Sequence, residues 1–168
     1  MAMVDMLVNL MDLPEDPALY KKLGQEKIRL VRALSVDKRR VLHWLEEQEY
    51  GGFVSECDVC FAHTPVSCFL AVGPDGLLGV ACYDATAPDF FGPTVVASAA
   101  RGKGIGKALL LCALEALREE GYAYAIIGGV GPAAFYEKCV RAQVIPGSTP
   151  GVYRRMIAYR PPENADNG

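Results

Sequence analysis

A glycine-rich turn in the second half of the chain carries the residues best suited to chemistry. Its sequence is Arg101-Gly102-Lys103-Gly104-Ile105-Gly106, and a helix-like apolar run begins directly after it at Lys107. Glycine allows positive φ angles and lets a ligand approach the backbone closely. The first turn of a helix leaves backbone N–H groups unpaired and carries a partial positive charge, so it attracts anions. The turn therefore predicts a binding site for a phosphate or pyrophosphate group.

The spacing of this turn excludes the two most familiar nucleotide-binding loops. A Walker loop needs glycine where Arg101 stands and a hydroxyl residue where Ala108 stands. The dinucleotide fingerprint needs Gly-x-Gly-x-x-Gly, whereas the chain has Gly102-x-Gly104-x-Gly106 and no ribose-binding acid at the expected distance. The pattern that remains is Arg-x-x-Gly-x-Gly after a short apolar strand.

Two motifs resemble those of the GNAT superfamily of acyl-CoA-dependent N-acyltransferases. Arg101, Gly104 and Gly106 occupy the defining positions of its pyrophosphate-binding motif. The run 133–138, Ala-Ala-Phe-Tyr-Glu-Lys, is similar to the family helix whose tyrosine faces the thioester sulfur, which is Tyr136 in this chain. The resemblance implies an enzyme, an N-acetyltransferase with acetyl-CoA (coenzyme A) as its cofactor. A primary amine on a small molecule or peptide would attack the thioester directly.

The same resemblance implies a set of site residues. Tyr136 would act as the general acid for the leaving thiolate, and the Val96 backbone N–H would polarise the acyl carbonyl. Asp84 is the candidate base or acceptor-site residue, with Asp89, His63 and water as alternatives. A Tyr136 that only packs on the sheet is the competing interpretation. The residues expected to bind the cofactor are Val95, Val96, Arg101, Gly102, Lys103, Gly104, Ile105, Gly106 and Lys107.

Hydrophobic periodicity supplies the elements that would position these residues. Ser35 is expected to cap a helix over 36–48, Gly121 to end a helix over 104–120, and Pro132 to precede a short helix over 133–140. Strands are expected over 28–32, 59–62, 66–72, 77–84, 94–98, 122–127, 143–145 and 152–159. This order resembles the GNAT fold, an α/β (α+β) arrangement. Its mixed, mainly antiparallel central sheet is flanked by helices, and a splayed strand pair holds the cofactor.

Length and composition suit one main domain without nucleic-acid or membrane partners. The 168 residues predict an extension over 1–25 with a short strand and an Asp16-capped helix, an acyltransferase domain over 26–160, and a disordered tail over 161–168. With 17 Lys and Arg against 20 Asp and Glu, there is no basic field to attract nucleic acid or an anionic membrane. No apolar run is long enough to span a membrane and no signal peptide is evident, so we expect a cytoplasmic protein.

The cysteines offer one alternative chemistry. Cys57, Cys60, His63 and Cys68 could supply four zinc ligands. However, the interval between Cys60 and His63 is tighter than in a zinc knuckle, and Cys68 opens an apolar run typical of a buried strand. Thiols in apolar runs usually behave as small buried side chains. We therefore expect reduced cysteines and no metal.

Two other functions remain open at this point. A non-catalytic acyl-CoA-binding or sensing module would keep the phosphate turn without transferring the acyl group. A zinc-binding interaction module would centre on residues 57–68. The balanced charge of the chain does not identify the amine acceptor. Homodimers are common in the family, but nothing in the sequence establishes one.

Overall fold

A single mixed sheet organises the computed structural model, which describes residues 3–160. Its seven strands lie in the order β2-β3-β4-β5-β6-β1-β7, and every neighbouring pair is antiparallel except β5 and β6. Across the sheet they are β2 (Arg29–Arg32), β3 (Cys68–Gly73), β4 (Gly76–Tyr83), β5 (Phe90–Val96), β6 (Tyr124–Val130), β1 (Val4–Asn9) and β7 (Gln143–Val144). The expected mainly antiparallel sheet is confirmed.

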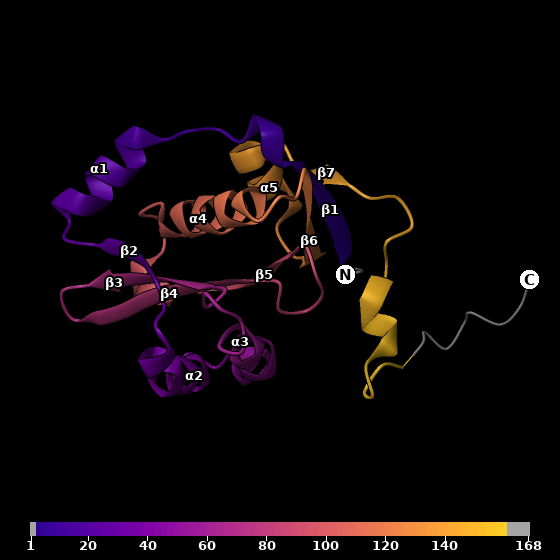
Figure 1. Ribbon diagram of the computed structural model, residues 1–168, viewed down its shortest axis with the longest axis horizontal. Helices are drawn as coiled ribbons and strands as arrows, with labels where there is room; N and C mark the ends of the chain where they lie inside the picture. The colour runs from indigo at the N-terminus through magenta and orange to yellow at the C-terminus, as the bar shows by residue number, and fades with distance from the viewer. Residues whose placement is uncertain (1–2, 161–168) are drawn as a thin grey trace, which may run out of the picture.

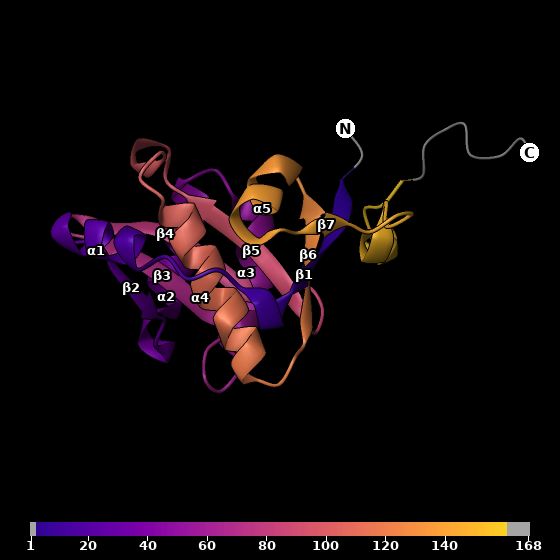
Figure 2. The same ribbon diagram turned by 90° about the horizontal axis from the view of Figure 1, so that it is seen from above.

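Helices cover both faces of this sheet and bury two separate apolar clusters (Figure 1). The helices are α1 (Pro17–Gln25), α2 (Lys38–Glu47), α3 (Val54–Cys60), α4 (Ile105–Glu119) and α5 (Ala133–Val140). Figure 2 shows α4 lying across the strands, with α5 beside it. Helices α2 and α3 pack on the opposite face. Within residues 3–160, no helix combines the length and apolar character needed to cross a membrane.

The N-terminal segment contributes directly to the sheet. Strand β1 pairs with β6 along most of its length and with β7 on its other side. Helix α1 follows, with Pro17 in its first turn and the Asp16 carboxylate accepting the Leu19 N–H at 3.1 Å. This is the cap that the sequence predicted. The 161–168 tail expected to be disordered lies outside the described residues.

Two expected strands are wrong. Residues 59–62 lie at the end of α3 and in the turn after it. Cys57 and Cys60, three residues apart, are buried, whereas Val59 between them is exposed, as expected for a helix. A short apolar run is compatible with either a strand or a helix, and here it forms a helix. The second is the strand expected over 152–159, where a 3-10 helix, Gly151–Arg155, occupies the first half of the segment. The adjacent edge strand β7 has only two residues, so it offers no pairing edge for another long strand.

An irregularity in β5 opens the sheet where the site lies. Strand β5 starts at Phe90, earlier than the expected 94–98, and pairs with β4 through Val96. Its parallel pairing with β6 ends at Phe91 and Ile127. Between Phe91 and Thr94, β5 has one residue more than β4, and Pro93 at this bulge has no N–H to donate. The strands β5 and β6 therefore separate beyond Phe91, as the splayed pair was expected to do.

Candidate functional site

The turn between β5 and α4 presents a cluster of free backbone donors. Gly104 stands at the N-cap of α4 with φ at 87° and ψ at 7°, a left-handed conformation that favours glycine. A Cβ at this position would lie 2.5 Å from Cδ1 of Leu19 on α1, so a larger residue would also displace the Leu19 side chain. Within the described chain, the N–H groups of 102–107 donate to no backbone acceptor. These donors fit an anionic diphosphate at a helix N-terminus.

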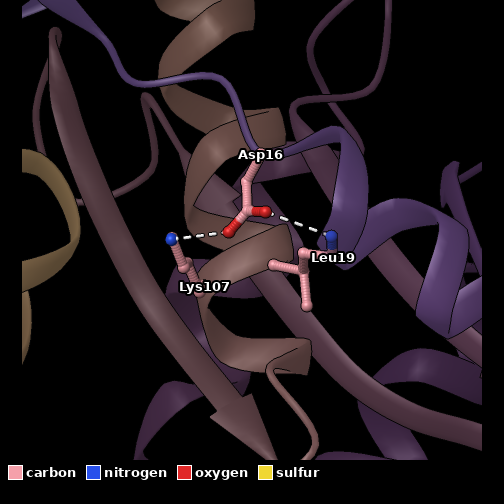
Figure 3. Close-up of polar contacts among 3 residues, drawn as sticks. All are labelled: Asp16, Leu19 and Lys107. Carbon is pink, nitrogen blue, oxygen red and sulfur yellow. Dashed lines mark hydrogen bonds and ion pairs between the residues drawn. The ribbon is translucent and has the colours of Figure 1, made fainter.

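Charged side chains surround this turn, and acids hold two of them in place. Lys107 donates to the Asp16 carboxylate at 2.7 Å, so the cap of α1 is tied to the first turn of α4 (Figure 3). The Lys107 hydrogen bond and the Leu19 N–H lower the pKa of Asp16. Lys103 pairs with Glu26 at 3.2 Å. Helix α1 and the residues after it therefore anchor the turn.

Arg101 points along the end of β5 instead. Its Nε donates to the Val96 carbonyl at 3.3 Å, and a terminal nitrogen donates to the Tyr50 hydroxyl at 3.2 Å. No acidic side chain forms an ion pair with Arg101 among residues 3–160. Its charge is therefore available to an anion at the turn.

A cavity of about 510 Å³ extends from this turn to α5. Its walls are the end of β5, the turn with the start of α4, and the Pro132 to Tyr136 region. All the predicted cofactor-binding residues line it except Lys103, which is engaged by Glu26. The cavity is mainly apolar between a polar end at the turn and Tyr136, a shape that suits a long arm with a charged end.

A second cavity of about 470 Å³ lies against the first. It is walled by the separated part of β6, by α3 with the residue before it, and by Tyr153. The two cavities share five lining residues, which are Tyr50, Phe91, Thr94, Pro132 and Tyr136. Molecules held in the two cavities would therefore meet where β5 and β6 separate.

The backbone of β5 presents two amides to this gap. Ala97 N–H donates to the Leu78 carbonyl on β4 at 2.9 Å. Because alternate amides of a strand point to opposite edges, the Val95 N–H also faces β4, while those of Thr94 and Val96 face away. Val96 lines only the first cavity, whereas Thr94 borders both. The amide at the junction is therefore that of Thr94, two residues before the one expected from sequence.

Tyr136 also borders both cavities. Its side chain is only 7% exposed and packs edge-on against Phe91 and Phe135, with ring centroids 6.3 Å and 5.1 Å away. Burial, and to a smaller extent the Cys139 thiol, raise the pKa of Tyr136 to about 12. The phenol is therefore protonated at neutral pH and can donate a proton but not accept one.

The carboxylates expected from sequence lie elsewhere. Asp84 lines neither cavity and follows β4 at the opposite end of α4, beside Glu120. Its carboxylate accepts the Asp89 N–H at 2.6 Å, and its carbonyl contacts Nε2 of His63 at 3.1 Å. The structure thus brings Asp84, Asp89 and His63 together, but away from Tyr136 and the turn.

The second cavity contains functional candidates that the sequence did not reveal. Glu56 on α3 is the one charged side chain among the described residues that line it. The Thr86 hydroxyl donates to the Glu56 carboxylate at 2.5 Å. Tyr153 adds a hydroxyl whose pKa is raised to about 12, mainly by burial. None of the three lies in a recognisable motif, since they come from segments far apart in the chain.

Comparisons with known proteins agree on the family. The model of the acetyltransferase (GNAT) family matches residues 33–139. The GCN5-related glucosamine N-acetyltransferase region of a fungal multi-domain GH3 beta-N-acetylglucosaminidase superposes with a TM-score of 0.70 at 14% identity, covering 86% of this chain and 20% of that one. A Drosophila protein gives a TM-score of 0.63 at 12% identity, covering 86% and 48%.

A third structure is the GCN5-related N-acetyltransferase from Sphaerobacter thermophilus, with a TM-score of 0.52 at 18% identity and coverage of 86% and 50%. The chain thus spans between a fifth and a half of the length of these solved chains. A search of curated proteins finds no match. The family model covers well over half of the chain, and the three structures share its fold, so the chain belongs to the GNAT acetyltransferase family.

Proposed function

We propose that this protein transfers an acetyl group from acetyl-CoA to a primary amine by direct attack, without a covalent enzyme intermediate. One observation carries the proposal: the two cavities share Thr94, which lies beyond the part of β5 that pairs with β6, and the largely buried Tyr136. Acyl transfer needs a polarised carbonyl and a proton for the leaving group. The backbone N–H of Thr94 would polarise the carbonyl, and the hydroxyl of Tyr136 would supply the proton.

The turn would hold the donor by its diphosphate. The free N–H groups of 102–107 provide directional donors, and the guanidinium of Arg101, which forms no ion pair within residues 3–160, provides positive charge. When bound, acetyl-CoA would supply an activated thioester. The apolar wall between the turn and Tyr136 would direct its arm along β5, where Val96 N–H offers a hydrogen bond.

The Thr94 amide is our candidate for polarising the acetyl carbonyl. A backbone N–H fixed in a strand is oriented before the reaction and needs no rearrangement as negative charge develops on the oxygen. Val96, the residue expected from sequence, lies in the donor cavity only, so we assign its amide to binding the arm. Tyr136 would then protonate the departing thiolate.

Glu56 is our candidate for recognising the amine. It is the one charge among the described residues of the acceptor-side cavity, and it is negative, so it favours a cationic amine. A carboxylate held by Thr86 can orient an ammonium group and accept its proton through water. We assign no proton transfer to Asp84, because it lines neither cavity.

The experiment combines an amine panel with a Glu56 variant. Release of CoA from acetyl-CoA is followed with a panel of primary amines, including glucosamine because the fungal relative carries that name. We expect Glu56→Gln to raise the acceptor KM by about 10-fold or more, since it removes a charge from the acceptor cavity but not from the donor cavity. The acetyl-CoA affinity should stay unchanged.

Glu119→Gln, at the far end of α4, is the matched control and should behave as wild type. If no amine supported CoA release while CoA still bound, the sensing module would be the better interpretation. An unchanged acceptor KM in Glu56→Gln would remove Glu56 from the acceptor site without affecting the donor assignment.

A further inference from the structure

Four buried cysteines converge between α3 and the sheet, outside the two cavities. The Sγ atoms of Cys57, Cys68 and Cys82 all lie within 4.8 Å of one another. The Cys60 thiol lies beside them, with its Sγ 4.0 Å from the carbonyl oxygen of Tyr83, the residue after Cys82. All four side chains are 0% exposed and none is in a disulfide. They account for much of the apolar cluster beneath α2 and α3.

Local structure explains why these thiols meet. Cys57 and Cys60 are three residues apart on α3, so both face the sheet. Cys68 and Cys82 are directly opposite on β3 and β4. The neighbouring Tyr83 N–H donates to the Ser67 carbonyl, so the cysteines form a pair without backbone hydrogen bonds, in which side chains are closest. Two helix thiols therefore face two strand thiols.

A buried hydroxyl group without a hydrogen-bond partner lies beside this cluster. Ser67 is 2% exposed, and its Oγ finds no partner at ordinary hydrogen-bond distance within residues 3–160. Its backbone N–H donates to the Cys60 carbonyl at 3.2 Å, so Ser67 lies beside the end of α3 that carries two of the cysteines. A Cys60 thiolate would give the Ser67 hydroxyl the acceptor it lacks.

We propose that Cys57, Cys60, Cys68 and Cys82 bind a structural zinc ion. Zinc takes four thiolates in a tetrahedron at about 2.3 Å, which places the sulfurs about 3.8 Å apart. The sulfurs of Cys57, Cys68 and Cys82, which lie within 4.8 Å of one another, need only a small contraction to reach this geometry. Cys60, on the same face of α3, would complete the set by a rotation of its side chain toward them. On binding, the thiols release their protons to solvent, and no redox change occurs.

This ligand set differs in one residue from the set considered in the sequence analysis. His63 is exposed and its Nε2 contacts the Asp84 carbonyl, so it is not part of the cluster. Cys82 takes its place, 22 residues after Cys60 in the printed sequence. The opening of a strand at Cys68 argued against zinc, but the pairing of β3 with β4 makes that strand the source of two ligands.

The ion would fasten α3 to the sheet. Helix α3 has seven residues, too few to be stable alone. Glu56, which lines the second cavity, directly precedes the ligand Cys57. Zinc would therefore stabilise one wall of that cavity and leave the turn at 102–107 unaffected. The zinc assignment itself does not depend on the proposed acetyl transfer.

The test measures metal in the wild-type protein, purified without an affinity tag or chelator. We expect about one zinc ion per chain, and cobalt(II) in its place should give the visible absorption of tetrahedral thiolate coordination. Removing zinc should lower the Tm and expose α3 to protease, while CoA affinity is retained. Cys57→Ser and Cys82→Ser should lose the zinc, whereas Cys112→Ser, whose thiol contacts Tyr20, should keep it.

The wild-type measurements keep the proposal falsifiable if the serine variants fail to fold. Wild-type protein that holds no zinc and shows no cobalt thiolate absorption would overturn it. So would disulfides among the four cysteines, detected by mass spectrometry without reduction. Full zinc content in folded Cys57→Ser or Cys82→Ser would place the metal elsewhere and also overturn the assignment.

Discussion

Replacing Tyr136 with phenylalanine tests the proposed acid directly. The change removes the hydroxyl and keeps the ring, so the edge-on contacts with Phe91 and Phe135 remain. No hydrogen bond contributes to the raised pKa of this tyrosine. The substitution therefore leaves no unpaired partner in the fold, and we expect the Tm to stay within a few degrees of wild type.

The pKa of about 12 keeps Tyr136 in the form that an acid needs. At pH 7 only about one phenol in 10⁵ is ionised, so nearly every molecule carries the proton to be donated. General acids contribute roughly 10²–10⁴ to rate. A thiol has a pKa of about 8.5 and its thiolate leaves readily, so we expect the lower end. Tyr136→Phe should reduce kcat about 100-fold, which corresponds to about 2.7 kcal/mol in activation free energy.

The assay follows CoA release at saturating acetyl-CoA and measures CoA affinity separately by calorimetry. Affinity should persist in Tyr136→Phe because the turn is unchanged. Tyr124→Phe is the matched control, since Tyr124 is 52% exposed and lines neither cavity. Wild-type turnover in Tyr136→Phe would refute the acid role and favour a Tyr136 that only packs on the sheet.

Four substitutions at individual positions test the stability of the fold. Burial, and to a smaller extent the Asp84 charge, raise the pKa of Asp89 to about 6. Because the folded state binds this proton more tightly than the unfolded chain, the resulting stabilisation is complete below about pH 4 and is lost as the pH rises through 6. Asp89→Asn should therefore raise the Tm at pH 8 and not at pH 4; equal shifts at both would contradict the reasoning. Gly104→Ala, with φ at 87° and Leu19 in the way, should cost about 1–2 kcal/mol in denaturant unfolding and weaken CoA binding. Gly79→Ala would bring a Cβ to 2.9 Å from Cδ1 of Leu109 and 3.1 Å from the Val95 carbonyl oxygen on β5, and it should cost about 1–3 kcal/mol. Gly24→Ala, in open space on α1, should instead gain about 0.5–1 kcal/mol. The reverse order of these two effects would contradict the packing argument.

Local patterns predicted the elements whose structure depends on near neighbours. Helix α4 begins after Gly104 and ends before Gly121, as its apolar period and flanking glycines indicated. The Asp16 cap of α1 was also readable from a few adjacent residues. The short runs at 59–62 and 152–159 were misread because brief apolar segments suit a strand or a helix, and the choice depends on what they pack against.

The sequence by itself determined the glycine-rich turn with its free backbone donors, because a helix N-terminus after glycines leaves N–H groups unpaired within a few residues. It could not determine where the two cavities meet. The position of Thr94 depends on the bulge of β5 opposite β4, and the position of Glu56 depends on the packing of α3. Both depend on contacts between residues that are distant in the sequence. The same holds for Cys82, which reaches Cys57 only through the pairing of β3 with β4. Spacing in sequence fixes local backbone geometry, but distances between remote side chains exist only once the sheet has formed.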